Sequence, residues 1–240
     1  MLSELAGFLF PLRCAGCAVL LEPRAPGWLC PSCFARIEWL EDPLCAACGI
    51  PLAAGAGACC ERCLSRPQSF RRARAVIRYA ADGAAAEGVV GSILRRHKYG
   101  YDQCLGAVLL ECLVKRMPLE PADYDLVAPV PLHWTRLWRR GFNQAALLAR
   151  GLAARFGLAF EAELLFRRRR TPSQTARGQA ARAQNVRHAF GVAKPARLAG
   201  RRVLLVDDVM TTGATANECA RVMLEAGGHF VDVLALARAV

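Results

Sequence analysis

Lysine is scarce in this sequence, although the chain is strongly basic. Of its 32 basic residues only Lys98, Lys115 and Lys194 are lysines, so arginines carry most of the net charge of +12 at pH 7. A basic surface favours polyanions such as nucleic acid, phosphorylated metabolites or acidic membranes. The chain is also rich in alanine, and a bias in coding composition would raise the arginine count in the same way. Charge alone therefore leaves nucleic-acid binding open.

Long hydrophobic runs are also missing. The apolar run from Leu5 to Leu12 is too short to cross a bilayer, and it has no basic flank before it as a signal peptide would have. We therefore expect neither a transmembrane segment nor an export signal, and we expect a cytoplasmic protein. Thiols stay reduced in the cytoplasm, where pairs of cysteines are more typical of metal ligands than of disulfides.

Cysteine, by contrast, is abundant and concentrated in the first third of the chain. Nine of the 12 cysteines lie between Cys14 and Cys63, and eight of them form four Cys-x-x-Cys pairs separated by 12, 11 and 11 residues. Each pair can supply half of a tetrahedral zinc site. Sequential pairing predicts one site from Cys14, Cys17, Cys30 and Cys33 and a second from Cys45, Cys48, Cys60 and Cys63. Interleaved pairing is also compatible with the spacing, and Cys59 is left over.

The composition changes after the last cysteine pair, which predicts two domains. Residues 1–66 contain few aliphatic side chains, so two structural zinc ions would hold a small double zinc-ribbon domain together. Residues 67–240 carry apolar runs typical of buried strands, alternating with helical sequences. We expect an α/β domain with a mostly parallel sheet flanked by helices. Its strands are expected at 73–80, 125–130, 203–209 and 230–237, and its helices at 84–94, 105–117, 145–156 and 216–226. Cys104 and Cys112 are expected in its core.

The clearest functional pattern lies at residues 203–215, where an apolar strand ends at Asp207 and Asp208. A small turn follows, made of Thr211, Thr212, Gly213, Ala214 and Thr215, and leads into a helical sequence. Ligands of parallel sheets bind beyond the carboxyl ends of the strands. Free amides at the start of a helix suit a phosphate, and paired carboxylates suit sugar hydroxyls or a divalent cation. The pattern predicts a sugar-phosphate site, unless the carboxylates merely end a strand and the turn merely caps a helix.

Three basic segments supply candidate partners for further phosphates. Arg136 and Arg140 lie in a segment between a strand and a helix, which we interpret as a loop whose guanidinium groups match pyrophosphate oxygens. Lys98 belongs to a basic run that by itself is typical of a solvated helix end. The stretch 167–187 resembles a mobile loop that orders over a ligand, or a basic linker with affinity for nucleic acid. We interpret His133 as a structural residue.

Residues 203–215 resemble the phosphoribosyl pyrophosphate signature of the type I phosphoribosyltransferases. Across nearly the whole chain, the order of motifs resembles the ComF family of competence-associated proteins. These motifs are the cysteine pairs, Lys98-Tyr99, Pro-Val-Pro-Leu-His at 129–133, Arg-Gly-Phe-Asn-Gln-Ala at 140–145, a loop rich in glutamine and arginine, and the 203–215 signature. The chain departs from the family at Ala176-Arg177-Gly178, where a Gly-Leu-Ser element is common.

The resemblance implies a type I phosphoribosyltransferase fold and, in many bacteria, a role in natural transformation, with protein partners in the DNA-uptake machinery and single-stranded DNA as ligand. By position, Asp207 and Asp208 match the ribose-facing acidic pair and Thr211 to Thr215 match the 5-phosphate loop. The implied reaction displaces pyrophosphate from phosphoribosyl pyrophosphate with Mg²⁺ present, and Lys98, Arg136 and Arg140 are expected to bind substrate.

Activity itself stays open at this point. One alternative is an inactive scaffold or DNA-binding adaptor gated by phosphoribosyl pyrophosphate, and another is a nucleobase or amido phosphoribosyltransferase of nucleotide metabolism. A repressor of the purine type would need a DNA-reading module, and the absence of a helix-turn-helix pattern in the sequence argues against it. We find no residue that identifies the acceptor.

Overall fold

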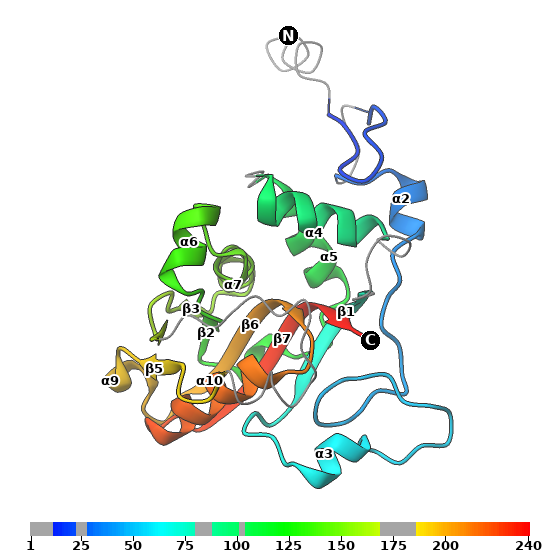
Figure 1. Cartoon of the computed structure of the whole chain (residues 1–240). Helices are drawn as coiled ribbons and strands as arrows, with labels where there is room; N and C mark the ends of the chain where they lie inside the picture. The colour runs from blue at the N-terminus through cyan, green and yellow to red at the C-terminus, as the bar shows by residue number, and fades with distance from the viewer. Residues whose placement is uncertain (1–11, 23–27, 80–87, 101–103, 169–185) are drawn as a thin grey trace.

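The computed structural model describes residues 12–22, 28–79, 88–100, 104–168 and 186–240 (Figure 1). Its centre is a five-stranded sheet in the order β1-β7-β6-β2-β3. All four pairings between neighbouring strands are parallel. The strands are β1 (Ala73–Tyr79), β2 (Leu126–Pro129), β3 (Ala159–Phe160), β6 (Arg202–Met210) and β7 (Phe230–Ala239). A short antiparallel pair, β4 (Leu165–Arg167) and β5 (Phe190–Val192), lies beside the sheet.

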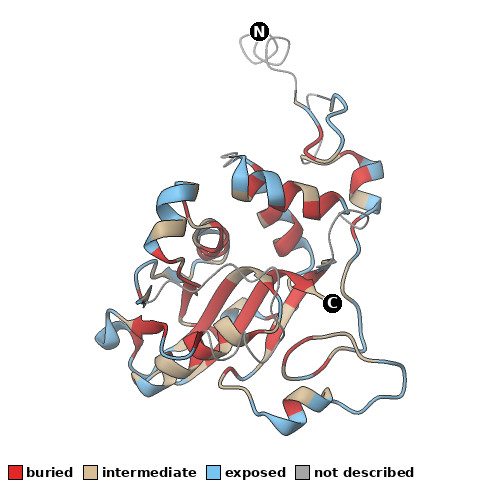
Figure 2. Cartoon of the chain, in the orientation of Figure 1, coloured by how far each residue is buried: buried red, intermediate tan, exposed pale blue. Residues whose placement is uncertain are grey.

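The two central strands are buried on both faces, as their continuous apolar sequences predict. Val203, Leu204, Leu205 and Val206 of β6 are wholly buried. Figure 2 shows the sheet as the most continuously buried part of the molecule. The expected α/β class with a mostly parallel sheet is therefore confirmed.

Helices cover both faces of this sheet (Figure 1). One face packs against α4 (Val89–Tyr99), α5 (Leu105–Lys115) and α7 (Gln144–Phe156). The other face packs against α10 (Ala214–Glu225) and the β4-β5 pair. The shorter helices are α2 (Pro31–Ala35), α3 (Glu61–Ser65), η1 (Pro121–Asp123), α6 (Trp134–Arg140) and α9 (Pro195–Leu198). Among the described helices, none has the length and hydrophobicity needed to cross a membrane.

The two halves of the cysteine-rich segment pack on opposite faces of the sheet. Cys14 and Cys33 belong to the hydrophobic cluster of α4 and α5, whereas Cys45 and Cys48 belong to the cluster of α10. The chain between them runs beside β1: the amide of Leu40 donates to the carbonyl of Val76 (2.9 Å), and the amide of Arg78 donates to that of Glu38 (2.8 Å). This contact covers the free edge of β1. The domain boundary near residue 66 stays a prediction.

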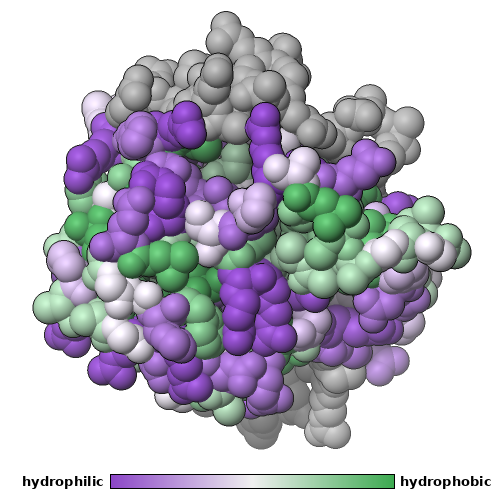
Figure 3. All heavy atoms as spheres, turned by 90° about the horizontal axis from the view of Figure 1, so that it is seen from below, coloured by the Kyte–Doolittle hydropathy of each residue, from purple (hydrophilic) through white to green (hydrophobic). Residues whose placement is uncertain are grey.

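Seen from below, the molecule presents hydrophobic patches separated by hydrophilic side chains (Figure 3). The second cysteine-rich half and α10 lie on this side in Figure 1. Because the apolar residues of α10 face the sheet, this helix leaves a largely polar surface outward.

Several expectations from the sequence were wrong. The helix expected to end at residue 94 continues to Tyr99 as α4, and strands β3, β4 and β5 were not expected. The arginine-rich segment after β2 is not a loop but helix α6, because the ring of His133 accepts a hydrogen bond from the amide of Thr135 at its start and Gly141 ends it in the left-handed conformation. Cys104 is exposed just before α5, whereas Cys112 is buried as expected. Of the basic stretch 167–187, residues 169–185 lie outside the described part of the chain.

Candidate functional site

Asp207 and Asp208 lie near the carboxyl end of β6, where several segments meet. β2 is parallel to β6, and the amide of Val130 just beyond it donates to the carbonyl of Val206 (2.8 Å). The strand ends therefore lie side by side, and the segments that follow them, α6 and the loop into α10, rise at the same edge of the sheet. Both carboxylates are only partly exposed.

The turn from Thr211 to Thr215 forms the start of α10. Gly213 adopts the left-handed conformation (φ 77°) directly before the helix, and the amide of Ala214 donates to the hydroxyl of Thr212 (3.4 Å). A small cavity of about 40 Å³ is lined by Asp207 and by the residues of this turn. Residues 213–216 at the start of this 12-residue helix line the cavity, and the dipole of a helix start suits a phosphate group.

Lys98 reaches the carboxylates from the last turn of α4. Its Nζ lies 2.6 Å from Oδ2 of Asp208, and both side chains are mostly buried. Burial alone would raise the pKa of Asp208, but Lys98 and the amide of Val209 outweigh burial and lower this pKa. Burial and the adjacent charge of Asp208 raise the pKa of Asp207. The two carboxylates therefore differ: Asp208 is held as an anion, and Asp207 takes up a proton more readily.

The Arg-Gly-Phe-Asn-Gln motif positions the elements around this site. Phe142 packs against the ring of His97 on α4 (centroids 4.9 Å apart), which fixes the helix end that carries Lys98. Asn143 caps α7 by accepting from the amide of Ala145 (3.1 Å), and its Nδ2 donates to the carbonyl of Val130 (3.0 Å). The motif thus ties α4, α7 and the end of β2 together.

The predicted arginines lie on α6 at this edge of the sheet. Nη1 of Arg140 donates to Oε1 of Gln144 (3.1 Å), and the guanidinium lies 5.3 Å from the ring centroid of Tyr99, next to Lys98. Arg136 is electrostatically coupled to Arg167 at the end of β4, which in turn interacts with Asp207. Burial lowers the pKa of Arg167, and the nearby charge of Arg136 lowers it further. Basic groups from α4 and β4 therefore interact with the carboxylate pair, and Arg136 of α6 lies near one of them, Arg167.

Arg238 is a residue near this site that the sequence reasoning missed, and Arg167, expected only as the first residue of a mobile loop, instead ends strand β4. Arg238 is wholly buried within β7, opposite Met210 in the strand register. Its Nη1 lies 3.9 Å from the position that a Cβ on Gly213 would occupy, directly against the turn. A buried charged residue is rare, and a charged side chain that directly follows the apolar run from Val233 to Ala237 is the signal that would have found Arg238.

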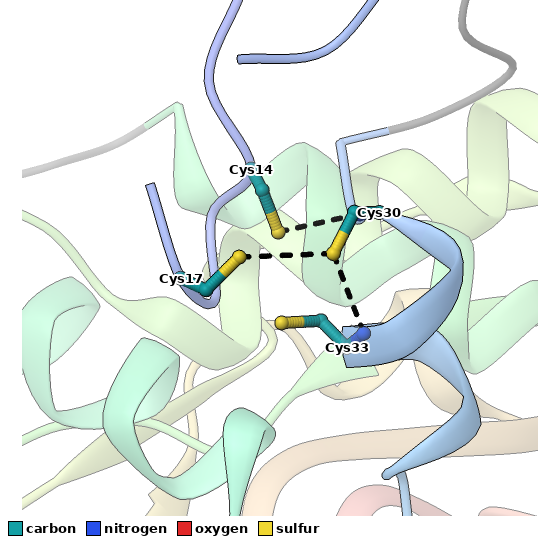
Figure 4. A group of neighbouring side chains, drawn as sticks. All are labelled: Cys14, Cys17, Cys30 and Cys33. Carbon is teal, nitrogen blue, oxygen red and sulfur yellow. Dashed lines mark hydrogen bonds between the residues drawn. The ribbon is translucent and has the colours of Figure 1, made fainter. Parts of the chain in front are cut away.

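The first cysteine cluster fits a zinc ion. The sulfur atoms of Cys14, Cys17, Cys30 and Cys33 all lie within 4.8 Å of one another, and those of Cys17 and Cys30 are 3.7 Å apart (Figure 4). A tetrahedral zinc site with Zn–S distances of about 2.3 Å places its sulfurs roughly 3.8 Å apart. Burial alone would raise the pKa of the Cys14 thiol. Hydrogen bonds from backbone amides, of which that of Cys30 has the largest effect, outweigh burial and lower this pKa to about 6, as a thiolate ligand requires.

The second cluster repeats this geometry with Cys45, Cys48, Cys60 and Cys63. Its sulfurs also lie within 4.8 Å of one another, and those of Cys48 and Cys60 are 3.8 Å apart. Sequential pairing, one of the two alternatives left open by spacing, is therefore what the structure shows. Cys59 takes no part in either cluster.

Comparisons with known proteins agree with both halves of the chain. The family model of the double zinc ribbon domain matches residues 5–64, and that of the phosphoribosyl transferase domain matches residues 139–239. Among solved structures, adenine phosphoribosyltransferase from Thermoanaerobacter pseudethanolicus is 20% identical, with a TM-score of 0.37 over 58% of this chain and 83% of that chain.

Two curated relatives match almost from end to end. DNA utilization protein YhgH of Escherichia coli K12 is 31% identical over 228 residues, which cover 92% of this chain and 96% of that protein. Competence protein F of Haemophilus influenzae is 30% identical over 236 residues, which cover 96% of this chain and 98% of that protein. The chain therefore belongs to the ComF family, whose double zinc ribbon and phosphoribosyltransferase domain it carries in the same order.

Proposed function

We propose that this protein binds phosphoribosyl pyrophosphate with Mg²⁺ and acts on single-stranded DNA during natural transformation, in the cytoplasm. The observation that carries the proposal is the continuity of Asp207 and Asp208 with the helix-start turn at Thr211 to Thr215. One end of this arrangement suits a ribose and a cation, and the other suits a phosphate. The names of the relatives, DNA utilization protein and competence protein, support the DNA part.

Each group at the site has a distinct role in this proposal. The amides and hydroxyls of Thr211 to Thr215 bind the 5-phosphate, while Asp207 and Asp208 hold the ribose hydroxyls or the Mg²⁺. When bound, Mg²⁺ supplies positive charge to the pyrophosphate leaving group. Lys98 already pairs with Asp208 (2.6 Å), so its ammonium must share that carboxylate with the ligand. Once displaced, Lys98 would join Arg136 and Arg140 as a cationic partner of the pyrophosphate.

The chemistry that these residues support is displacement of pyrophosphate from the anomeric carbon. The developing positive charge on the ribose ring is stabilised by the two carboxylates, of which Asp208 is held as an anion by Lys98. No side chain needs to form a covalent intermediate, because positioning and fixed charges account for the acceleration. The acceptor is left unassigned.

Calorimetric titration with phosphoribosyl pyrophosphate, with and without Mg²⁺, tests the proposal. Wild-type protein is expected to bind, and the Asp207→Asn/Asp208→Asn variant is expected to lose at least about tenfold in affinity. Glu120→Gln, which removes an exposed carboxylate elsewhere, serves as the matched control. Absence of binding by wild-type protein under both conditions would contradict the proposal.

A scaffold that binds phosphoribosyl pyrophosphate without consuming it is the second candidate. The Lys98–Asp208 pair favours it, because a cationic side chain already neutralises a carboxylate that catalysis would use. Release of pyrophosphate, measured with and without single-stranded DNA or free nucleobases, separates the two. Binding without release under every condition identifies the scaffold.

A further inference from the structure

Helix α6 presents large aromatic side chains to the outside of the molecule. Trp138 is 87% exposed and Trp134 is 70% exposed, and Leu137 between them is 43% exposed. Figure 2 shows α6 coloured mainly as exposed and intermediate. Tryptophan is usually well buried on average, so two exposed indoles on a helix of seven residues are unfavourable for the isolated fold. Such an arrangement marks a binding surface more often than a packing defect.

The two indoles lie on one side of the helix. Trp134 and Trp138 are four residues apart, so they project from neighbouring turns about 6 Å apart along the axis. The helix is held at both ends, by the His133 cap and by Gly141, and its orientation is set by Asn143 bound to Val130. The rings are therefore carried by a fixed element and not by a loose segment.

Cationic groups surround these rings, and α6 itself contains no acidic residue. Arg136, Arg139 and Arg140 belong to the same helix, and Arg139 is exposed. Beyond Arg140 lies Tyr99, a third ring, which is 60% exposed and 5.3 Å from the guanidinium of Arg140. Exposed aromatic rings alternating with arginines match a ligand that offers flat π faces along a negatively charged backbone.

Single-stranded nucleic acid has this combination of chemical groups. Its unpaired bases stack on aromatic rings, and its phosphates pair with the neighbouring guanidinium groups. In a duplex the base faces are already stacked and paired, so they are unavailable to the indoles. Because α6 follows β2, the platform belongs to the same carboxyl edge of the sheet as Asp207 and Asp208 at the end of β6.

We propose that α6 is a stacking platform for single-stranded nucleic acid, with Trp134 and Trp138 each taking one base and Arg136 and Arg139 contacting phosphates. The inference deepens the proposed function, on whose DNA-binding part it rests, by naming the surface that holds the strand. It is independent of whether phosphoribosyl pyrophosphate binds.

Fluorescence anisotropy of a labelled oligothymidine tests the platform with the full-length, zinc-loaded protein. Trp138→Ala and Trp134→Ala are each expected to weaken binding roughly fivefold or more, and the double variant more strongly. Trp138→Phe retains a ring and is expected to bind nearly as wild type. Leu64→Ala, which removes a 70% exposed apolar side chain on α3, is the matched control and is expected to bind as wild type.

Salt dependence separates stacking from charge. Trp138→Ala is expected to lower affinity without changing the slope of log affinity against log salt, whereas Arg139→Gln is expected to reduce that slope by roughly one. A duplex of the same sequence is expected to compete weakly. Circular dichroism checks that each variant is folded, and the remaining Trp28 and Trp39 pack against the core in every variant.

The outcomes are distinguishable from those of the proposed function. If wild-type protein binds oligothymidine and both tryptophan variants bind equally well, the platform is wrong while the proposed DNA role stands. If wild-type protein does not bind at low salt, both the platform and the DNA role fail, whereas calorimetry still reports on phosphoribosyl pyrophosphate. If the tryptophan variants lose binding only to anionic lipid vesicles, α6 is a membrane contact and the platform is overturned.

Discussion

The guanidinium of Arg238 joins the second cysteine cluster to the turn before α10. Its Nη2 lies 3.7 Å from Sγ of Cys48, and its Nη1 lies against Gly213. Within the described residues, Nε and Nη1 of this buried side chain have no hydrogen-bond partner. A buried cation is costly unless a negative charge compensates it, and zinc-bound thiolates provide such a charge. A phosphate at the turn would provide a second one.

Replacing Arg238 with methionine is expected to weaken binding of phosphoribosyl pyrophosphate roughly tenfold, because a buried positive charge beside the anion is lost. Release of zinc to a chelator is expected to become faster, since Cys48 loses its donor. The fold without ligand is expected to be less stable, because removing one partner leaves the buried thiolate charge less compensated. Arg78→Met is the control: Arg78 lies opposite Arg238 in the strand register but is exposed. Unchanged affinity for phosphoribosyl pyrophosphate in Arg238→Met would show that Arg238 does not contribute to ligand binding at the turn.

The carboxylate pair predicts a rise in ligand affinity with pH. Burial and the charge of Asp208 raise the pKa of Asp207, so in acid Asp207 is protonated and cannot hold a cation. Asp208→Asn removes that charge and releases Lys98, so the pKa of Asp207 should fall. The rise in ligand affinity should then occur at lower pH than in the wild type. Calorimetry across a pH series measures the shift. Asp125→Asn is the control, because Arg202 already lowers the pKa of Asp125 to about 2. An unshifted profile in Asp208→Asn would show that another group titrates.

Lys98→Met is expected to reduce the affinity for phosphoribosyl pyrophosphate about tenfold. The variant removes the ammonium proposed for pyrophosphate and raises the pKa of Asp208, which Lys98 now lowers. Equilibrium binding at pH 7 measures the loss. Lys194→Met breaks a 3.4 Å pair with the exposed Glu163, and such surface pairs contribute little, so it should behave as wild type. Equal affinity for phosphoribosyl pyrophosphate in both lysine variants would show that Lys98 does not take part in ligand binding.

Gly213→Ala is expected to destabilise the fold by about 1 kcal/mol and to weaken phosphate binding. The space is sufficient, because the nearest atom to an added Cβ is Sδ of Met210 at 3.7 Å. The cost comes from the left-handed backbone (φ 77°), which a residue with a Cβ adopts unfavourably. Urea denaturation measures the change. Gly57→Ala, where a Cβ meets nothing within 4 Å and φ is not positive, should be close to neutral.

Zinc analysis by mass spectrometry is expected to find two ions per chain. Cys17→Ser and Cys45→Ser should each reduce the content to one, because each removes a ligand from a different cluster. Both variants should unfold at lower temperature, since each cluster packs against a different face of the sheet. Cys59→Ser and Cys104→Ser should retain two ions. Loss of both ions from a single variant would mean that the clusters are not independent.

Local patterns were sufficient for the four longer strands, the cysteine pairs and the turn, whereas β3, β4 and β5, of two or three residues each, were not predicted. Val203 to Val206 form a continuous apolar run, and a strand buried on both faces follows from that run directly. Helix α6 was predicted as a loop because seven residues are too few to show a helical hydrophobic pattern. Its N-terminal cap is also a histidine, which is not among the usual capping residues.

Residues close together in the chain were enough to identify eight cysteines spaced as zinc ligands and a carboxylate pair followed by a short turn at the start of a helix, because each of these patterns is local. The three-dimensional arrangement was needed to show which cysteine pairs share a cluster, that the two clusters lie on opposite faces of the sheet, and that Lys98 pairs with Asp208. It also placed Arg238 between Cys48 and Gly213. The contacts of Lys98 with Asp208 and of Arg238 with the turn join residues far apart in sequence, which the packing of α4 and the parallel pairing of β6 with β7 bring together.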